Sequence, residues 1–463
     1  MNSYFHSVTT NPKACKGCTN CIKYCPMEAI RVRSGVAEII PERCIDCGEC
    51  IRQCPSHAMI YIQDSLSVLE KKKYNVALVE PALIAQFHNL TDPDIVLTAL
   101  LELGFDAVEE ISIGHEIYAR EAKKFIKNHQ EHRPYISTTC PAVVRLVRTR
   151  YQTLVDHLLP IQSPMEISAA IALGKAMEKT GLSREEIGIT HIAACPAQIA
   201  YSNEPLGLKK SRITANIGIK SIYPKLVVRM NALKGNVQKL SAKSAKGYGD
   251  RASGVNSILI NENYIEATDI KSILKILDGL EDDEYTEYDF INLLMCTGGC
   301  LNGDLCVENH YAARASFRKI SKNLVNEIKP NELPFVADVY WNKRIRFENV
   351  YQLGDSMKDS LNMLATIKRI ESEFPGLDCG ACGAPTCKAL AEDIVRRKAF
   401  RKDCIYYTRK HIHELTKDIN EFSEEISVSI GKDQLSHDQL IKLQDFINRL
   451  WIETNALDEK YRK

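Results

Sequence analysis

The chain has 463 residues, and its 60 Lys and Arg against 59 Asp and Glu give a formal net charge of +1. This balance argues against unspecific nucleic-acid binding as the main task, because that task needs a basic surplus to neutralise phosphates. An apolar fraction of 45% excludes wholesale disorder. Because no apolar run reaches about 18 residues, we expect no membrane span. Residues 1–10 lack the apolar core of a signal peptide, so we expect a cytoplasmic protein.

The sequence contains 17 cysteines. A reducing cytoplasm keeps cysteines as thiols, so metal binding is a better explanation for them than disulfides. Eight of them lie within residues 15–54, five are scattered through the middle, and four lie within residues 379–404. This grouping predicts three metal-bearing regions.

The first group is an internal repeat. The pattern C-x-x-C-x-x-C-x-x-x-C-P occurs twice, ending at Pro26 and at Pro55. It is the run of two-cluster ferredoxins, in which three close thiolates bind one 4Fe–4S cube and the fourth binds the other cube. Zinc is the alternative, although zinc sites do not use crossed repeats of four cysteines. We expect one cube on Cys15, Cys18, Cys21 and Cys54, and the other on Cys44, Cys47, Cys50 and Cys25.

Residues 1–70 are therefore expected to form an N-terminal two-cluster ferredoxin-like domain that passes single electrons. Gly17 and Gly48 lie where the backbone must bend around the inorganic cores. The polar segment 64–73 ends in three lysines, and we interpret it as a solvated boundary.

The middle region has an α/β pattern. Periodic stretches predict helices at residues 94–103 and 163–179. Strands that alternate with helices form a mostly parallel sheet, and functional groups gather at the carboxyl ends of its strands. Short apolar runs predict buried strands at residues 76–79, 188–194 and 290–295.

Single cysteines follow these predicted strands. Cys195 and Cys296 come directly after two of them, and Cys140 follows residues 135–137. A lone cysteine is ordinarily a small packed residue, and Cys306 is interpreted in that way. The positions of the others after strands predict that cysteines distant in sequence converge on one site. Glycines 298, 299 and 303 around Cys300 leave room for a bulky group near the backbone.

Three segments resemble the signature segments of the catalytic domain of FeFe hydrogenases. They are Ser137-Thr138-Thr139-Cys140-Pro141, Ala193-Ala194-Cys195-Pro196-Ala197 and Met295-Cys296-Thr297-Gly298-Gly299-Cys300. Their order and the ferredoxin repeat in front of them also match. The resemblance implies an α/β catalytic domain over residues 71–340 that converts two protons and two electrons reversibly into dihydrogen. It implies ferredoxin or another redox protein as the electron partner.

The same resemblance implies the cofactor and its ligands. In that family a 4Fe–4S cube is joined to a di-iron unit that carries CO, CN and azadithiolate, and together they form the H-cluster. On this chain Cys300 is the bridging cysteine, and cofactor contacts are implied at Ala194 and Gly299. The four cube ligands are Cys140, Cys195, Cys296 and Cys300.

The chain departs from the family pattern on the proton route. Thr139 replaces a cysteine that relays protons, and a hydroxyl is a far weaker acid than a thiol. Gln198 replaces a lysine that donates to a cyanide, so it can donate but brings no charge. Leu159 replaces a relay serine, while Ala193 and Leu294 replace methionines.

Loss of a positioned acid–base group typically lowers a rate by about 100- to 10,000-fold. The pattern therefore resembles the sensory FeFe hydrogenases without a PAS domain (group D-like). Such a protein would report dihydrogen or redox state to a signalling partner, with no role for nucleic acid or membrane. A metabolic, ferredoxin-linked hydrogenase is one alternative. A hydrogenase-like iron–sulfur assembly or electron-transfer protein without the di-iron unit is another.

The last group predicts a small C-terminal iron–sulfur domain at residues 373–410. The spacing C-x-x-C-x-x-x-x-C with a distant fourth cysteine suits a 4Fe–4S cube, and zinc is the alternative. We expect a linker or helix at 341–372, a helix at 388–401 that returns the fourth cysteine, and a helical tail at 411–463 without room for a PAS domain. The four ligands are Cys379, Cys382, Cys387 and Cys404.

The complete fold class expected is thus a multidomain α+β and α/β chain with four 4Fe–4S cubes. The histidines carry no assigned role: His57, His115, His132 and His191 are interpreted as ordinary surface or core residues.

Overall fold

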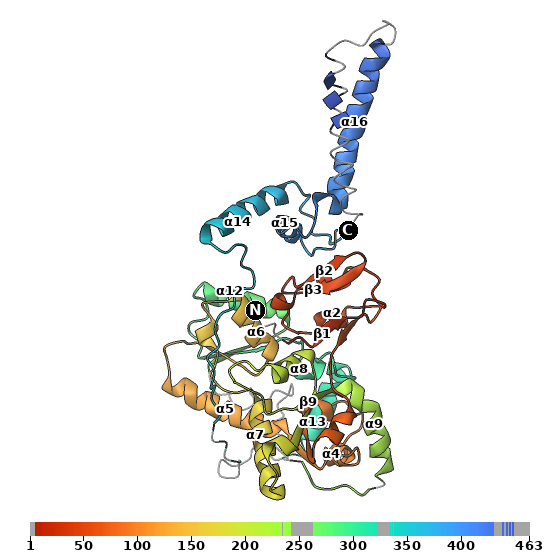
Figure 1. Cartoon of the computed structure of the whole chain (residues 1–463). Coiled ribbons are helices and arrows are strands. Elements are labelled where there is room, and N and C mark those ends of the chain that lie inside the picture. Colours follow the sequence, from red (N-terminus) through yellow and green to blue (C-terminus); the bar gives the residue numbers. More distant parts are fainter. Residues whose placement is uncertain are drawn as a thin grey trace. The chain divides into compact units, whose positions relative to one another are not determined.

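The computed structural model divides the chain into two compact units (Figure 1). One comprises Met1–Asp355 with Gly383–Pro385, and the other comprises Ser356–Cys382 with Thr386–Lys463. Among the described residues, no helix is both long and apolar enough to cross a membrane. The structure describes residues 5–233, 235–241, 263–322, 324, 334, 336, 338–429, 438, 441, 442, 444, 445, 447 and 448.

The N-terminal part of the first unit is a duplicated arrangement of short elements. The outer strands β1 and β4 pair antiparallel, and β2 and β3 form an antiparallel hairpin. Helices α1 and α2 each follow a residue in the left-handed region, Thr19 and Gly48. The elements are β1 (Val8–Thr10), α1 (Asn20–Lys23), β2 (Ile30–Arg33), β3 (Val36–Ile39), the 3₁₀ helix η1 (Pro41–Arg43), α2 (Glu49–Arg52) and β4 (Met59–Tyr61).

Two parallel sheets organise the rest of the first unit. One has four strands in the order β6-β5-β8-β9, and the other has three in the order β10-β11-β7. Parallel sheets are covered by helices on their faces, and almost every strand residue here is buried or half-buried. The strands are β5 (Tyr74–Val79), β6 (Ala107–Glu110), β7 (Tyr135–Ile136), β8 (Ile187–Ala193), β9 (Ala215–Gly218), β10 (Tyr264–Thr268) and β11 (Phe290–Leu294).

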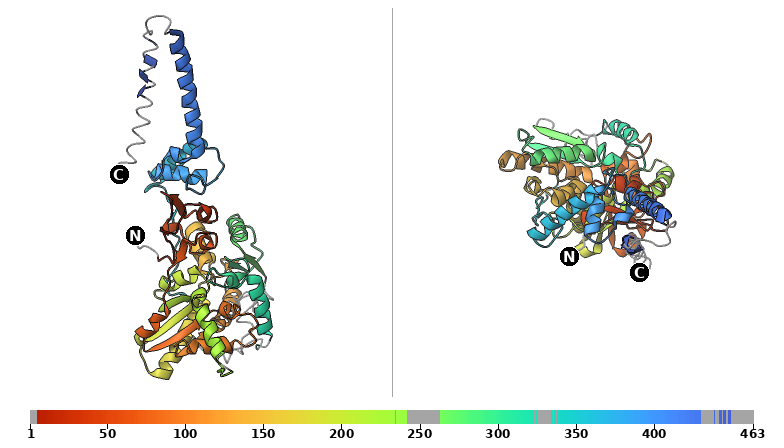
Figure 2. Two further views of the ribbon diagram at one scale, coloured as in Figure 1. Left: turned by 90° about the vertical axis from the view of Figure 1, so that its right-hand side faces the viewer. Right: turned by 90° about the horizontal axis from the view of Figure 1, so that it is seen from above.

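Helices connect and cover these strands, and Figure 2 shows them in two further views. The α-helices are α3 (Pro81–Ile84), α4 (Asp94–Leu101), α5 (Ile111–Asn128), α6 (Pro141–Arg150), α7 (Pro164–Thr180), α8 (Pro196–Asn203), α9 (Ile219–Ala232), α12 (Ile270–Glu281) and α13 (His310–Ser321). The 3₁₀ helices are η2 (Leu66–Lys71), η3 (Val155–His157), η4 (Arg184–Glu186) and η5 (Gly299–Asn302).

Three strand-to-helix junctions share one local design. Shortly after a parallel strand ends, one residue in extended backbone precedes a proline that begins a helix. Proline suits the first helical position because its missing N–H has no partner there anyway, and it forces the residue before it into extended backbone. The residues placed in this way are Glu80, Cys140 and Cys195.

The ferredoxin-like part shares a hydrophobic core with the α/β part. Met27 and Ile45 are 1% and 2% exposed and belong to the same buried cluster as Leu78, Ile189 and Ile291. The loops that carry the second set of ferredoxin-type cysteines are therefore fixed against the sheets rather than tethered loosely.

The second unit contains α14 (Met357–Ser372), α15 (Cys387–Val395), the 3₁₀ helix η6 (Arg401–Asp403) and α16 (Ile405–Ser429), which Figure 2 shows as one continuous helix. Side chains cap two of these helices, because Ser356 accepts from the Asp359 N–H and Thr386 accepts from the Ala389 N–H. Such caps satisfy backbone donors that have no partner inside the helix.

The strands expected at residues 76–79, 188–194 and 290–295 are present and parallel, with ends shifted by a residue or two, but they lie in two sheets and not in the one sheet expected. The segment 64–73 is largely exposed, as interpreted, although it contains η2 with Val68 buried. The helix expected at 388–401 was wrong in its length, because it ends at Val395 and Arg397 adopts a positive φ of 60°. The helical tail expected at 411–463 begins earlier, at Ile405, and most of it beyond residue 429 lies outside the described residues.

Candidate metal centres

The first ferredoxin-type pocket gathers the expected cysteines from both repeats. Cys15, Cys18 and Cys21 line it together with Cys54. Burial, followed by the charges of the other three cysteines, raises the pKa of the Cys21 thiol to about 11. Thiols that raise one another's pKa in this way would share their negative charge with a cation, which is what an iron–sulfur cube provides.

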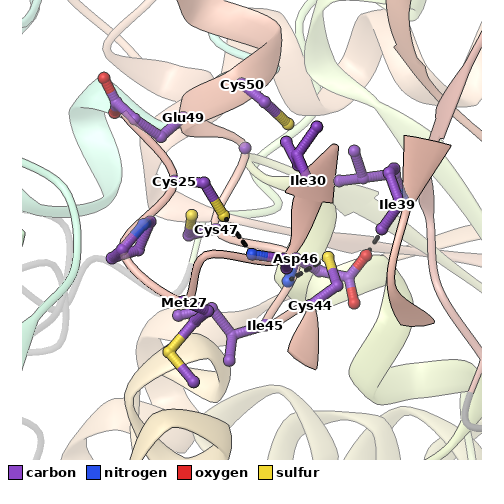
Figure 3. Close-up of a pocket in the computed structure, with 14 residues that line it drawn as sticks. Cys25, Met27, Ile30, Ile39, Cys44, Ile45, Asp46, Cys47, Glu49 and Cys50 are labelled. Atoms are coloured by element: carbon purple, nitrogen blue, oxygen red, sulfur yellow. Dashed lines mark hydrogen bonds between the residues drawn. The ribbon is translucent and has the colours of Figure 1, made fainter. Parts of the chain in front are cut away.

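The second pocket has the complementary set (Figure 3). Cys44, Cys47 and Cys50 line it together with Cys25 from the other repeat. Backbone N–H groups already point at two of the sulfurs: Ala29 donates to Cys25 Sγ at 3.3 Å and Asp46 donates to Cys44 Sγ at 3.4 Å. Donors of this kind stabilise thiolate sulfur around a cluster. The crossed arrangement predicted from the spacing is thus the one in which the side chains lie.

A third pocket brings together four cysteines from distant parts of the sequence. Cys140 precedes α6, Cys195 precedes α8, Cys296 follows β11, and Cys300 lies in η5. All four line one pocket with an empty volume of about 450 Å³. Cys140 and Cys296 follow the neighbouring strands β7 and β11 of the three-stranded sheet, whereas Cys195 follows β8 of the four-stranded sheet. The pocket thus combines residues that follow the carboxyl ends of strands in both sheets, where functional groups of parallel sheets gather.

The chemistry of this donor set fits a metal cluster. Burial, and after it the charge of Asp304, raise the pKa of Cys296 to about 12. Burial, and then the charges of the other cysteines of the set, hold the pKa of Cys195 well above its usual range. Four close thiolates cannot ionise together without a cation. Iron would supply that charge, so the residues present fit a 4Fe–4S cube.

Close backbone contact holds two of the cysteine-bearing segments together. Leu305 N–H donates to the Ala194 carbonyl at 3.0 Å. A Cβ on Gly303 would lie 2.1 Å from the same carbonyl oxygen. Since the obstacle is backbone, only glycine fits at this position without displacement of one segment.

We therefore expect Gly303→Ala to destabilise the protein by about 1–3 kcal/mol, the usual cost of overpacking. The measurement is the midpoint of chemical unfolding together with bound iron. Gly174→Ala in α7 is the matched control, because a Cβ there meets nothing within 4 Å. Equal midpoints for the two variants would contradict the close approach.

A further pocket lies on the other side of Cys300, with an empty volume of about 340 Å³. It shares Cys300, Thr139, Gln198 and Leu294 with the four-cysteine pocket. Cys300 is therefore the cysteine that faces both spaces, as the bridging role implied by the resemblance requires. The remaining lining residues are Glu80, Ile111, His115, Ser163, Pro164 and Met165.

Thr139 and Gln198 line both pockets, and their contacts are now visible. Thr139 Oγ1 lies 3.0 Å from the Ser137 hydroxyl. Gln198 Oε1 accepts from the Ala194 N–H at 2.8 Å, and its Nε2 donates to Glu80 Oε1 at 2.6 Å. One amide hydrogen of Gln198 is thus occupied by Glu80, which leaves the second for any group in the pocket.

The positions of the other residues discussed from the sequence are also defined. Ala194 and Gly299 line the four-cysteine pocket. Leu159 is fully buried, so no hydroxyl stands at the expected relay position. Cys306 lies beside the site, with its thiol 3.5 Å from the Cys300 carbonyl oxygen, and burial raises its pKa far above the usual range.

Sequence reasoning missed Glu80, and it interpreted His115 and His191 only as ordinary surface or core residues. Glu80 and His191 are 3% and 0% exposed, with Nε2 of His191 3.3 Å from Glu80 Oε1. His115 lines the same pocket as Glu80. A signal existed in the sequence: Val79-Glu80-Pro81 has the strand, polar residue and proline order that also places Cys195.

The second ferredoxin-type pocket, the four-cysteine pocket and the further pocket form a series, because neighbouring members share lining residues. Cys47 lines both the second ferredoxin-type pocket and the four-cysteine pocket. Arg52 reinforces this junction, since its guanidinium pairs with Asp304 at 2.9 Å and donates to the Asn302 carbonyl at 2.9 Å. The arrangement suits electron transfer from the ferredoxin-like part to the four-cysteine site.

In the second unit the four C-terminal cysteines surround α15 and η6 in sequence. Cys387 begins α15, and its N–H donates to Asp378 Oδ1 at 2.7 Å. Cys404 follows η6 and is 6% exposed. Arg401 pairs with Glu373, which ties the turn after α15 to the end of α14.

Comparisons with known families agree with this order of parts. Residues 73–204 match the family described as iron only hydrogenase large subunit, C-terminal domain. Residues 7–55 match a 4Fe-4S dicluster domain, and residues 374–406 match a family described as an Fe-S cluster. Iron hydrogenase 1 of Clostridium pasteurianum is 22% identical over 254 residues, which cover 45% of this chain and 44% of that relative's length.

Solved structures of FeFe hydrogenases are similar at lower identity. One, from a study of oxygen inactivation of the H cluster, is 14% identical with a TM-score of 0.47 and covers 62% of this chain and 98% of its own. A variant of the Chlamydomonas reinhardtii enzyme is 16% identical with a TM-score of 0.43 and covers 58% of this chain and 88% of its own. From the family matches, the chain is an FeFe hydrogenase-like protein in which iron–sulfur domain matches precede and follow the hydrogenase match in sequence, and it spans less than half the length of the curated relative.

Proposed function

We propose that this protein binds dihydrogen and slowly interconverts it with protons and electrons at an H-cluster, and that it acts as a sensor of hydrogen or redox state. The supporting observation is a contrast between two residues that line both pockets. Cys300 offers a thiol that can bind iron, whereas Thr139 carries only a hydroxyl where the family has a relay thiol. The cluster ligands are complete and the proton relay is not.

Each set of residues has a place in this proposal. Cys140, Cys195, Cys296 and Cys300 would hold the cube, and Cys300 would join it to the di-iron unit in the further pocket. That unit, when bound, supplies the site at which dihydrogen is split or formed. Gln198 would orient it through its remaining amide hydrogen, and apolar Ile111, Met165 and Leu294 would exclude water from it.

Electrons would travel along the series of pockets described above. The two ferredoxin-type cubes would exchange them with ferredoxin or another redox protein, through Cys47 at the junction with the four-cysteine site. The C-terminal iron–sulfur domain would carry a fourth cube. It would pass a signal to a separate protein in a cytoplasmic setting.

Turnover of the matured protein with a low-potential dye tests the proposal. Because no thiol stands at position 139, we expect hydrogen evolution and oxidation slower than in prototypical FeFe hydrogenases by about 100- to 10,000-fold. Rates equal to those of prototypical enzymes would overturn the sensory assignment and favour the metabolic alternative.

A pair of variants tests the interrupted route directly. Thr139→Cys alone is expected to change turnover little, because Leu159 remains a fully buried apolar residue where a relay hydroxyl is needed. Thr139→Cys combined with Leu159→Ser is expected to raise turnover by about 10-fold or more. The measurement is dye-coupled turnover at matched iron content. A large gain from Thr139→Cys alone would show that Leu159 does not block the route.

A further inference from the structure

The further pocket contains an acidic side chain that the proposed function has not used. Glu80 is 3% exposed and comes from the end of β5, just before the proline that begins α3. It lines this pocket together with Thr139 and Cys300. A carboxyl group therefore stands in the same small space as the hydroxyl that replaces the usual relay thiol.

The two oxygens of Glu80 have different surroundings. Oε1 accepts from Gln198 Nε2 at 2.6 Å and lies 3.3 Å from His191 Nε2. Oε2 is buried and has no hydrogen-bond partner among the described residues. A buried carboxylate oxygen without a partner is unfavourable, so Oε2 is available to a group bound in the pocket.

Glu80 also lacks the contacts of a structural buried carboxylate. Glu166 is such a carboxylate, because it accepts from Ser211 and from the Arg212 N–H and lies 3.6 Å from the Arg212 guanidinium. No Lys or Arg in the described part of the chain pairs with Glu80. Its contacts are with neutral Gln198 and with His191, a residue that can carry a proton.

Other ionisable groups face Glu80 from each neighbouring element. His191 lies on β8, His115 on α5, and Cys300 in η5, with Cys306 after it. Glu80 and Cys300, the cysteine that lines both pockets, line the same small pocket.

From this geometry we infer that Glu80 is the acid–base residue of the site, with Oε2 giving and taking the proton that a thiol at position 139 would otherwise relay. The inference rests on the proposed function and names the residue that supports its slow turnover. Formation of each dihydrogen consumes two protons and two electrons. Each proton leaves Glu80 Oε2, a new proton reaches Glu80 from the side of His191, and the electrons arrive through the cysteine-lined series. Oxidation runs the same steps backwards.

Gln198 and His191 are then positioning residues. Gln198 fixes the carboxyl through Oε1 and is itself fixed by the Ala194 N–H. His191 is fully buried on the central β8, and its Nδ1 has no partner among the described residues. A second proton-binding nitrogen behind the carboxyl suits a relay that reloads Glu80 after each transfer.

The test compares the matured wild type with Glu80→Gln, which keeps the shape and hydrogen bonding of the side chain but holds no exchangeable acid proton. Infrared spectra follow the CO and CN bands as pH is varied, and dye-coupled turnover is measured on the same samples. Glu80→Asp is the conservative variant. Glu109→Gln is the control, because Glu109 lies on the neighbouring strand β6 and pairs with Lys175 at 2.8 Å.

We expect Glu80→Gln to keep the bands but to lose their dependence on pH, and to lose turnover by about 100-fold or more. Glu80→Asp should recover part of both, and Glu109→Gln should match the wild type. Wild-type pH dependence and turnover in Glu80→Gln would overturn the inference while the proposed function stands. Absence of CO and CN bands from the wild type would overturn both. If Glu80→Gln loses its iron, Glu80→Asp decides: turnover and pH dependence unchanged from the wild type would overturn the inference, and a shifted pH dependence would support it.

Discussion

Replacement of Cys300 by serine is expected to remove the CO and CN infrared bands and to reduce hydrogen turnover to background. Cys300 lines both the four-cysteine pocket and the pocket that contains Glu80. A serine hydroxyl has nearly the same size but is a much weaker acid than a thiol, so it is a poor ligand for iron. The variant should therefore fail to join the two parts of the cofactor even when the fold is intact.

Cys306→Ser provides the matched control for this variant. Cys306 is near Cys300, and its thiol lies 3.5 Å from the Cys300 carbonyl, a contact that a serine hydroxyl can make equally well. We expect Cys306→Ser to keep the infrared bands and most of the turnover. Retention of the bands in Cys300→Ser, or their loss in both variants to the same degree, would contradict a bridging role for Cys300.

Replacement of Cys25 by serine is expected to eliminate the cube held by the other repeat. Cys25 belongs to the first repeat in sequence, but it lines the pocket of Cys44, Cys47 and Cys50 (Figure 3). We expect about four iron atoms fewer per protein, the content of one cube. Turnover with reduced ferredoxin should collapse because the series of cubes is interrupted before Cys47.

Electron paramagnetic resonance of the reduced protein identifies which cube is lost. Cys54→Ser is the partner experiment, since Cys54 lines the pocket of Cys15, Cys18 and Cys21. The crossed arrangement predicts that Cys25→Ser and Cys54→Ser eliminate different signals, each belonging to the repeat that does not contain the altered residue. Loss of the cube within the altered residue's own repeat would contradict it.

Much of this site could be anticipated because metal ligands follow strict rules of type and spacing. The crossed pairing of Cys25 and Cys54 follows from two identical local repeats, and the structure places both side chains in the opposite pocket. The placement of Cys140 and Cys195 also follows from local order, since each stands between a parallel strand and a helix that begins with proline. Their convergence does not, because β7 and β8 belong to different sheets.

Glu80 could not be assigned in the same way. An acidic residue before a proline is common on protein surfaces, and only the pairing of β5 between β6 and β8 buries this one. Its partners Gln198 and His191 lie more than a hundred residues away. Nor did the local pattern show that Val68 in η2 is buried, because this residue stands within a polar, lysine-rich segment. Long-range packing decides both features.

The central claim is that the four-cysteine site and the pocket beyond Cys300 together hold an H-cluster. Infrared spectroscopy of the matured protein tests it most directly, because CO and CN ligands absorb where protein groups do not. We predict CO and CN bands that change between samples reduced under dihydrogen and samples oxidised without it. Absence of these bands in every redox state, with the iron–sulfur cubes present, would contradict the claim and leave an electron-transfer or assembly protein.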